Sequence, residues 1–257
     1  MNLHGDLTFK GAIDRLKRHR LAARNPGPDL QRDTSLKTAL ERLSMHRLNI
    51  RHGFSIGAGS GSDSGYIHQN LCPESEMLLI EAQDVHEPAL KKMAERRGIS
   101  YTICAAAEKD GEINFINSSP TGGAAVAAPS EHSVTVPARS IDSLAAERGW
   151  SGPFILKFDT HGVELDILAG ASETLSRTTL VMMEVYNFRL NFVQGKNLLF
   201  HEMCQWMEQH NLRCVDMCEP LFRPNDGAFW QMHLFFIRTD HPVFRSNSYS
   251  APPAFSA

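Results

Sequence analysis

The sequence has few cysteines, no long apolar run and little net charge, and each of these absences excludes a class of protein. Its five cysteines are an odd number, and no two show the two-residue spacing of zinc and redox motifs. No segment approaches the roughly 20 apolar residues of a membrane-spanning helix, and the N-terminus lacks the apolar centre of a secretory signal. A formal net charge of −3 predicts no strong attraction to nucleic acid or membranes. We therefore expect a soluble cytoplasmic protein with reduced thiols, no nucleic-acid partner and no membrane span.

The length of the chain limits its domain organisation. With 257 residues, 42% of them hydrophobic and 21% charged, the chain can form one large globular domain but not two well-cored enzymatic domains. Segment 36–43 places its apolar residues on one helical face, and the Ser- and Pro-rich C-terminus has little to bury. We predict a helical N-terminal extension over residues 1–50, a main domain over 51–240 and a flexible tail over 241–257.

From about Arg51 onward, short apolar runs alternate with segments of helical periodicity, which is typical of strands joined by crossover helices around a parallel sheet. We predict seven strands, over Phe54–Ile56, Met77–Ile80, Ser100–Cys104, Phe154–Phe158, Leu180–Val185, Leu212–Asp216 and Met232–Arg238. Helices with apolar stripes are predicted over Glu87–Arg97, Val163–Leu175 and Asn197–His210. Ser118–Ser130 is rich in glycine, alanine and serine, so we expect a mobile loop that could cover an active site.

A glycine-rich turn follows the first predicted strand. In the run Ile56–Gly65, glycines alternate with other residues; such a turn lets the backbone adopt unusual torsions and lets a ligand approach without obstruction by Cβ atoms. Glu81 ends the second predicted strand, 24 residues after Gly57. A carboxylate at that strand tip can accept hydrogen bonds from both ribose hydroxyls of an adenosine-containing ligand. The turn and Glu81 together predict a site for such a ligand.

The spacing of the glycines separates two classes of adenosine ligand. A dinucleotide turn has two residues between its second and third glycines, which seats a pyrophosphate on the helix N-terminus. Here Gly57, Gly59 and Gly61 are separated by single residues. S-adenosylmethionine carries no phosphate, so its turn has only to hold an adenosine and a sulfonium amino acid. The spacing favours S-adenosylmethionine and leaves an NAD(P)-dependent Rossmann oxidoreductase as the alternative.

The most specific segment is Phe154–Ala171. A buried strand delivers Asp159 to its carboxyl end, Gly162 allows a tight turn, and a helix begins at once. This segment resembles the signature of the FkbM-type methyltransferase family, in which a strand ending Leu-Lys-apolar-Asp leads to a Gly, a Glu-Leu pair and a closing Gly-Ala. The resemblance runs from about Thr34 to Arg238, and it takes in Ile56–Ala58, Leu79–Ala82, Val136–Leu144, Met183–Tyr186 and Arg223–Ala228.

The resemblance implies a fold and a cofactor. The fold is α/β: a Rossmann-like, doubly wound seven-stranded sheet of the class I methyltransferase type, with an antiparallel last strand and a helical N-terminal lead-in. The cofactor is S-adenosylmethionine. The candidate cofactor-binding residues are Gly57, Ala58, Gly59, Gly61, Glu81, Ala82, Ala106 and Asp159.

Three positions depart from the family's pattern. Ser55 stands where many members have Asp, so the methionyl amino group would have to be recognised by the backbone or by other carboxylates. His161 stands where Glu or Gln is frequent, and His233 stands where one branch has Asp. The departures concern the expected catalytic end of the site.

Polar residues near the carboxyl ends of the fourth and fifth predicted strands are the candidate catalytic residues. In doubly wound sheets the ligand lies beyond these ends, where Asp159, His161, Glu184 and Asn187 should cluster. His161 is the preferred base because histidine titrates near neutrality; the alternative is an exposed turn residue. Asp159 would orient the cofactor's amino group or the acceptor, or cap a helix. Glu184 would hold substrate or pair with a basic neighbour.

The predicted function is an S-adenosylmethionine-dependent methyltransferase that methylates a hydroxyl of a small molecule or glycan, such as a sugar or a secondary metabolite. Asp159, His161 and Glu184 offer mixed oxygen and nitrogen ligands, but no dense metal motif is present, so no metal is predicted. The alternatives are the NAD(P)-dependent oxidoreductase and a non-catalytic S-adenosylmethionine-binding protein. The sequence does not identify the acceptor.

Overall fold

The computed structural model describes residues 30–97, 99–117, 123–126, 131, 133–190 and 197–250. Contacts divide the chain into two units, residues 1–33 and 34–257. The sheets, the helices and the candidate site all belong to the second unit. Residues 1–29 and 251–257, at the two ends of the chain, lie outside the described residues.

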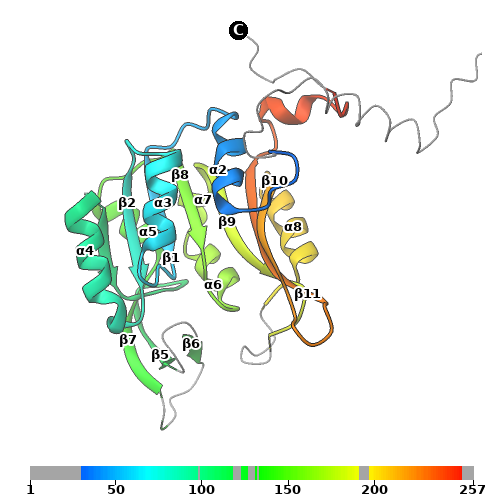
Figure 1. The fold of residues 1–257 in the computed structure, drawn as a ribbon. Helices are drawn as coiled ribbons and strands as arrows, with labels where there is room; N and C mark the ends of the chain where they lie inside the picture. Colours follow the sequence, from blue (N-terminus) through cyan, green and yellow to red (C-terminus); the bar gives the residue numbers. More distant parts are fainter. Residues whose placement is uncertain are drawn as a thin grey trace, which may run out of the picture. The chain divides into compact units, whose positions relative to one another are not determined.

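A seven-stranded sheet forms the centre of the fold (Figure 1). Its strands, in spatial order, are β10 (Leu212–Phe222), β11 (Phe229–Arg238), β9 (Thr178–Tyr186), β8 (Phe154–Phe158), β1 (His52–Ile56), β2 (Glu76–Glu81) and β3 (Ser100–Ile103). The pairs that join β9, β8, β1, β2 and β3 are parallel, whereas β11 runs antiparallel to both of its neighbours. The predicted fold class, with seven strands and an antiparallel last strand, is confirmed.

Helices cover both faces of the sheet, because successive side chains of a strand point to opposite faces. Phe54 and Ile56 of β1 belong to one apolar cluster, together with residues from α5 (Ile141–Glu147), α6 (Glu164–Ala169), α7 (Ser172–Ser176) and α8 (Phe200–Gln209). Ile155 of β8 belongs to the other, together with residues from α2 (Leu36–Ser44), α3 (Ser62–Leu71) and α4 (Glu87–Arg97). All five residues of β1 and of β8 are buried, which explains why most of them are apolar.

The helix predicted over Val163–Leu175 is in fact two short helices, α6 and α7, which are separated at Gly170 and Ala171. The chain passes so close to a neighbouring segment at this point that a Cβ on Gly170 would lie 2.3 Å from the carbonyl oxygen of Ala107. The carboxylate of Asp142 then accepts the backbone N–H of Thr174 at 2.8 Å, which starts the second helix. The apolar stripe predicted the buried face but not this interruption.

A second sheet of four strands was not predicted. Its order is β4 (Ala105–Ala106), β7 (Ser133–Arg139), β5 (Gly111–Asn117) and β6 (Gly123–Val126). The prediction of a loop over Ser118–Ser130 is therefore wrong for β6, which pairs antiparallel with β5; the rest of that segment lies outside the described residues. The small residues of β6 are needed here, because a Cβ on Gly123 would lie 2.4 Å from Cε1 of Phe115.

Helix α2 is tied to the outermost strand of the main sheet. Its N-terminus is capped by Ser35, whose hydroxyl accepts the Thr38 N–H at 3.3 Å. Near its C-terminus, Arg42 donates to both carboxylate oxygens of Asp216 on β10 at 2.7 Å. The bidentate pair fixes the predicted helix against the edge of the sheet. Two short 3₁₀ turns complete the described elements, η1 (Asp84–His86) and η2 (Pro242–Arg245).

Two expectations about the kind of protein can be compared with these elements. All five cysteines lie within the described residues and are free thiols, as the sequence predicts. Among the described helices, none combines the length and the hydrophobicity that a bilayer crossing requires.

Candidate active site

A cavity of about 630 Å³ opens at the carboxyl ends of β1, β2, β8 and β9, the edge where doubly wound sheets bind ligands. Of the candidate cofactor-binding residues, seven line it: Gly57, Ala58, Gly59, Glu81, Ala82, Ala106 and Asp159. The candidate catalytic residues Asp159, His161 and Glu184 line the same cavity. Residues predicted separately from the two halves of the sequence therefore meet in one place.

The glycine turn takes its shape from two close backbone contacts. The N–H groups of Gly57 and Ala58 both donate to the carbonyl oxygen of Ile80 on β2, at 3.0 and 3.1 Å. Gly57 has a φ of 71°, and a Cβ there would lie 2.1 Å from the carbonyl oxygen of Asp159. Only glycine fits this position, because the left-handed torsion and the neighbouring backbone both exclude a side chain.

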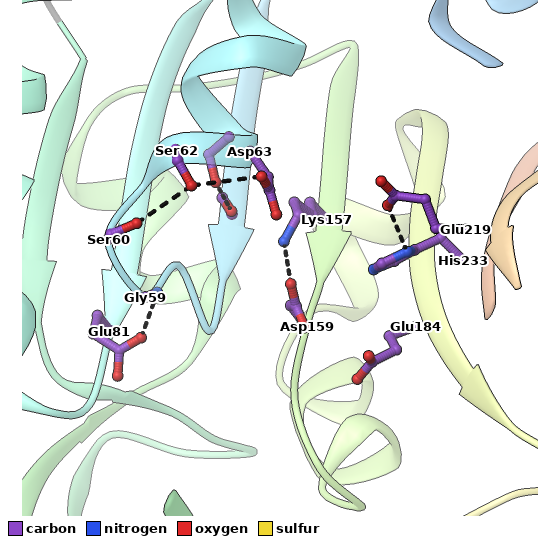
Figure 2. Close-up of polar contacts among 12 residues, drawn as sticks. Gly59, Ser60, Ser62, Asp63, Glu81, Lys157, Asp159, Glu184, Glu219 and His233 are labelled. Carbon is purple, nitrogen blue, oxygen red and sulfur yellow. Dashed lines mark hydrogen bonds and ion pairs between the residues drawn. The ribbon is translucent and has the colours of Figure 1, made fainter. Parts of the chain in front are cut away.

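Glu81 holds the turn in place from the tip of β2 (Figure 2). One carboxylate oxygen accepts the N–H of Gly59 at 2.7 Å, and the other accepts the N–H of Gln83 at 2.9 Å. The residue is only 6% exposed, yet it lines the cavity. Each carboxylate oxygen has a further lone pair, so Glu81 can still accept hydrogen bonds from a ligand's hydroxyls.

Gly61 of the turn and Ser55 of β1 serve the fold rather than the cavity. Gly61 is the N-cap of α3 with a φ of 78°, and a Cβ there would lie 3.0 Å from Leu79 and 3.2 Å from Leu90. It is the one candidate cofactor-binding residue that does not line the cavity. Ser55 is fully buried, and its hydroxyl shares a 2.7 Å hydrogen bond with that of Ser64. Ser55, which stands where many family members have Asp, thus joins β1 to α3.

The second sheet forms an apolar wall of the cavity. Ile113 and Phe115 from β5, and Gly123 and Ala125 from β6, line it beside Ala105 and Ala106. An apolar wall near Glu81 suits the flat face of a base whose ribose is held by a carboxylate. Apart from Ala106, this wall was not predicted, because β5 and β6 acquire their positions only by pairing with each other and with β7.

Lys157 and Asp159 form an ion pair beneath the cavity (Figure 2). The ammonium donates to Oδ2 of Asp159 at 2.7 Å, and the Lys157 side chain is 3% exposed, whereas that of Asp159 is 29% exposed. Burial raises the pKa of Asp159, but the Lys157 ammonium outweighs it, so the net pKa lies below its usual value. Asp159 therefore presents a carboxylate to the cavity while one of its oxygens is held from behind.

His161 belongs to a hydrogen-bonded chain of four side chains. Its Nδ1 lies 2.9 Å from the hydroxyl of Tyr186, and that hydroxyl donates to Oε2 of Glu184. The amide of Gln231 donates to Oε1 of the same carboxylate. Burial and the nearby Asp159 raise the pKa of Glu184, and burial with the Glu184 charge raises that of Tyr186. All four residues line the cavity.

A buried carboxylate shapes the turn that carries His161. Oε1 of Glu164 accepts the N–H of Gly162 at 2.8 Å and the hydroxyl of Thr160 at 3.0 Å. Glu164 is 6% exposed, and burial raises the pKa of its carboxyl. Because both bonds close the turn at the start of α6, Glu164 fixes the backbone on each side of His161.

His233 lies close to the carboxylates of Asp159 and Glu184, and its own partner is Glu219. Its Nδ1 is 3.4 Å from Oε2 of Glu219, and His233 holds the pKa of Glu219 below its usual value. Ligand atoms of Asp159, Glu184 and His233 all lie within 4.8 Å of one another, and Cys218, Glu219 and His233 form a second such group. These are the described residues best placed to hold a metal ion, but the Lys157 ammonium already supplies a cation to Asp159.

Sequence reasoning missed three residues of this region and misplaced one. Lys157 could have been noticed as a lysine inside an apolar strand, whereas Tyr186 and Gln231 gave no local signal. Asn187, which was expected in the cluster, instead donates through its side-chain amide to the carbonyl oxygen of Phe229 at 3.2 Å and does not line the cavity.

A comparison with protein families gives a match over most of the chain. The family described as "Methyltransferase FkbM domain" matches residues 16–214. No curated protein matches the chain.

A comparison with solved structures matches several methyltransferases at low sequence identity. Methyltransferase FkbM from Methylobacillus flagellatus KT is 16% identical with a TM-score of 0.46, and the match covers 72% of this chain but only 43% of that one. The 1,6-didemethyltoxoflavin-N1-methyltransferase from Burkholderia thailandensis, solved with 1,6-didemethyltoxoflavin and S-adenosylhomocysteine, is 14% identical with a TM-score of 0.42 and coverages of 93% and 94%. Precorrin-6y C5,15-methyltransferase from Geobacter metallireducens GS-15 is 13% identical with a TM-score of 0.45 and coverages of 82% and 92%.

Proposed function

Because the chain belongs to the methyltransferase FkbM domain family, whose methyl donor is S-adenosylmethionine, we propose that it methylates a hydroxyl oxygen with His161 as the general base. The acceptor is a sugar, a glycan or a secondary metabolite. The observation that carries the proposal is that His161 and Glu81 line one cavity, so a base lies within the same enclosed space as the residue suited to hold an adenosine.

The residues around Glu81 fit the cofactor. The Glu81 carboxylate keeps lone pairs for the two ribose hydroxyls after it has accepted the N–H groups of Gly59 and Gln83. A Cβ on Gly59 would have no heavy atom within 4 Å, so the backbone there is open to a ligand. Phe115 and Ala106 would contact the adenine, and Asp159 would receive the methionyl ammonium.

The remaining polar residues of the cavity would handle the acceptor. When bound, S-adenosylmethionine would supply a methyl group on a sulfonium, with a neutral thioether as the leaving group. The acceptor oxygen would take up the methyl group, and its proton would pass to His161. Because transfer from a sulfonium is an in-line displacement, the chain's main tasks are to align the acceptor and to exclude water.

The polar lining of this end of the cavity favours an acceptor with several hydroxyl groups. Asp159, Glu184 and Gln231 offer carboxylate and amide groups beside the aromatic ring of Tyr186. A sugar ring presents hydroxyls to such groups and an apolar face to an aromatic ring. The five free thiols fit action in a reducing compartment such as the cytoplasm.

The proposal is tested with His161→Ala. We expect kcat for methyl transfer to a panel of sugar and secondary-metabolite hydroxyls to fall by about 10²- to 10⁴-fold, while the affinity for S-adenosylhomocysteine, measured by calorimetry, stays the same. His210→Ala is the matched control, because His210 is exposed at the C-terminal end of α8 and lines no part of the cavity. Unchanged turnover of His161→Ala at saturating substrate would remove the base assignment.

A further inference from the structure

On the premise of the proposed function, we propose that Tyr186 is a positioning residue that keeps the ring proton of His161 on Nδ1 and so leaves Nε2 as the basic nitrogen. Glu184 and Gln231 hold Tyr186 in the state that does this. The inference comes from counting the donors and acceptors along the four side chains.

The count begins at Glu184. An ionised carboxylate accepts hydrogen bonds and donates none. Oε1 of Glu184 accepts the amide of Gln231, and Oε2 accepts the hydroxyl of Tyr186. Because the Tyr186 hydroxyl is the donor in its bond to Glu184, its only proton is committed to that carboxylate.

The direction of the Tyr186–Glu184 hydrogen bond also determines which ring nitrogen of His161 carries the proton. The Tyr186 oxygen lies 2.9 Å from Nδ1 of His161. Since its proton is already used, this oxygen can only accept a hydrogen bond from the ring, so Nδ1 must carry the proton. In a neutral imidazole one nitrogen is protonated and the other is not. Nε2 is therefore the nitrogen that carries no proton.

The register of two strands makes this arrangement rigid. Gln231 of β11 is paired directly with Tyr186 of β9, and His233 is paired with Glu184. Glu184 and Tyr186 are two residues apart on one strand and so share a face. Tyr186 is 6% exposed, and its ring meets the edge of Trp230 at a centroid distance of 6.1 Å. Because Tyr186 cannot turn away, its oxygen keeps its orientation toward His161.

The arrangement also serves the protonated state. When Nε2 takes the acceptor's proton, the O–H bond of the acceptor breaks, an N–H bond forms, and the ring becomes an imidazolium. Oε2 of Glu184 lies 3.6 Å from Nδ1, too far for a direct hydrogen bond but close enough to stabilise that charge. No side chain has to move between the two states of the base.

The proton position can be measured without any turnover. In protein labelled with ¹⁵N-histidine, long-range ¹H–¹⁵N spectra distinguish a protonated ring nitrogen from a bare one, and the His161 signals are assigned by their absence in His161→Ala. We expect a protonated Nδ1 and a bare Nε2 at neutral pH in the wild-type protein. A proton found on Nε2 would overturn the inference, whatever the fate of the proposed function.

Tyr186→Phe tests the consequence for catalysis. We expect the preference for a proton on Nδ1 to be lost, and kcat to fall by at least about 10-fold with an unchanged KM for S-adenosylmethionine. Tyr101→Phe is the matched control, because the Tyr101 hydroxyl donates to Glu87 at 3.3 Å in an exposed bond and does not line the cavity. If Tyr186→Phe folds and retains the wild-type proton position and kcat, Tyr186 does not set the tautomer. If it fails to fold, the wild-type spectrum decides the question alone.

Discussion

Gly57 lies directly against the backbone carbonyl of Asp159, so that a Cβ on Gly57 would be 2.1 Å from that oxygen. The contact joins the glycine turn after β1 to the end of β8, where Asp159 also donates its N–H to Ile56 at 3.0 Å. The parts of the cavity wall formed by the glycine turn and by Asp159 are thus joined through backbone atoms.

This contact predicts a large loss of stability for Gly57→Ala. The added methyl group would have to displace backbone, and alanine would also sit at a φ of 71°, so we expect a loss of at least about 2 kcal/mol in the free energy of unfolding. Gly59→Ala is the control, because its Cβ would meet nothing within 4 Å and only the torsional cost of about 1 kcal/mol remains. Urea unfolding measures both variants, and equal stabilities would contradict the role given to Gly57.

Glu81→Gln should weaken cofactor binding. In the wild-type protein the N–H groups of Gly59 and Gln83 each donate to one oxygen of Glu81. Glutamine replaces one of these oxygens with an NH₂ donor, so one of the two N–H groups would face another donor. Loss of one charge-assisted bond is worth roughly 1.5–3 kcal/mol, so we expect the Kd for S-adenosylhomocysteine to rise by about 10-fold or more. Calorimetry compares it with Glu76→Gln, an exposed change at the start of the same strand. An unaltered Kd would mean that Glu81 is not a ligand for the cofactor.

Asp159→Asn should destabilise the protein by leaving the Lys157 ammonium buried without its partner. Removal of one member of a buried pair costs about 3–5 kcal/mol, and we expect roughly 2–3 kcal/mol here because the Asp159 side chain is 29% exposed. The double variant Lys157→Met with Asp159→Asn should recover part of this loss. No recovery in a double-mutant cycle would show that the two side chains are not coupled.

The lowered pKa of Asp159 also sets the pH dependence of that difference. A carboxylate with a folded pKa below its unfolded value contributes stability above the unfolded pKa, near 4 in free peptides, and loses it as the pH falls through the folded pKa. The stability gap between wild type and Asp159→Asn should therefore be constant above about pH 5 and shrink in acid. Thermal unfolding of both proteins, measured from about pH 3 to about pH 8, covers both sides of this transition.

Glu184→Gln should raise stability at neutral pH while it lowers activity. Burial and the nearby Asp159 raise the pKa of Glu184, so its contribution to stability is present below the unfolded pKa and lost as the pH rises through the folded pKa. As the pH rises through that pKa, the melting temperature of Glu184→Gln should increase relative to wild type. The increase should be a few degrees if the variant gains about 1 kcal/mol in the free energy of unfolding. Glu208→Gln, an exposed change on α8, should show no such trend. A relative melting temperature that falls with rising pH would contradict the sign of the shift.

The sequence by itself determined the seven strands of the main sheet, the glycine turn and the position of Glu81. The strands were predicted because each contains a short apolar run that is visible locally, and in β1 and β8 all five residues are buried. Gly57 and Glu81 were found for a similar reason, since a turn and a strand tip each depend on a few adjacent residues. The four strands of the second sheet were missed; β5 and β6 among them have no such local signal, because their small or polar residues are stabilised by their pairing.

Only the tertiary structure decided how the catalytic end is assembled. His161 contacts Tyr186, which is 25 positions away in the sequence, and Glu184 contacts Gln231, which is 47 positions away. These partners meet because β11 inserts antiparallel beside β9 in one register, and a shift of one residue would turn every side chain to the other face. Periodicity records which face of a strand is buried, but it does not record which strand lies beside it or at what offset. The proton position on His161 depends on that offset.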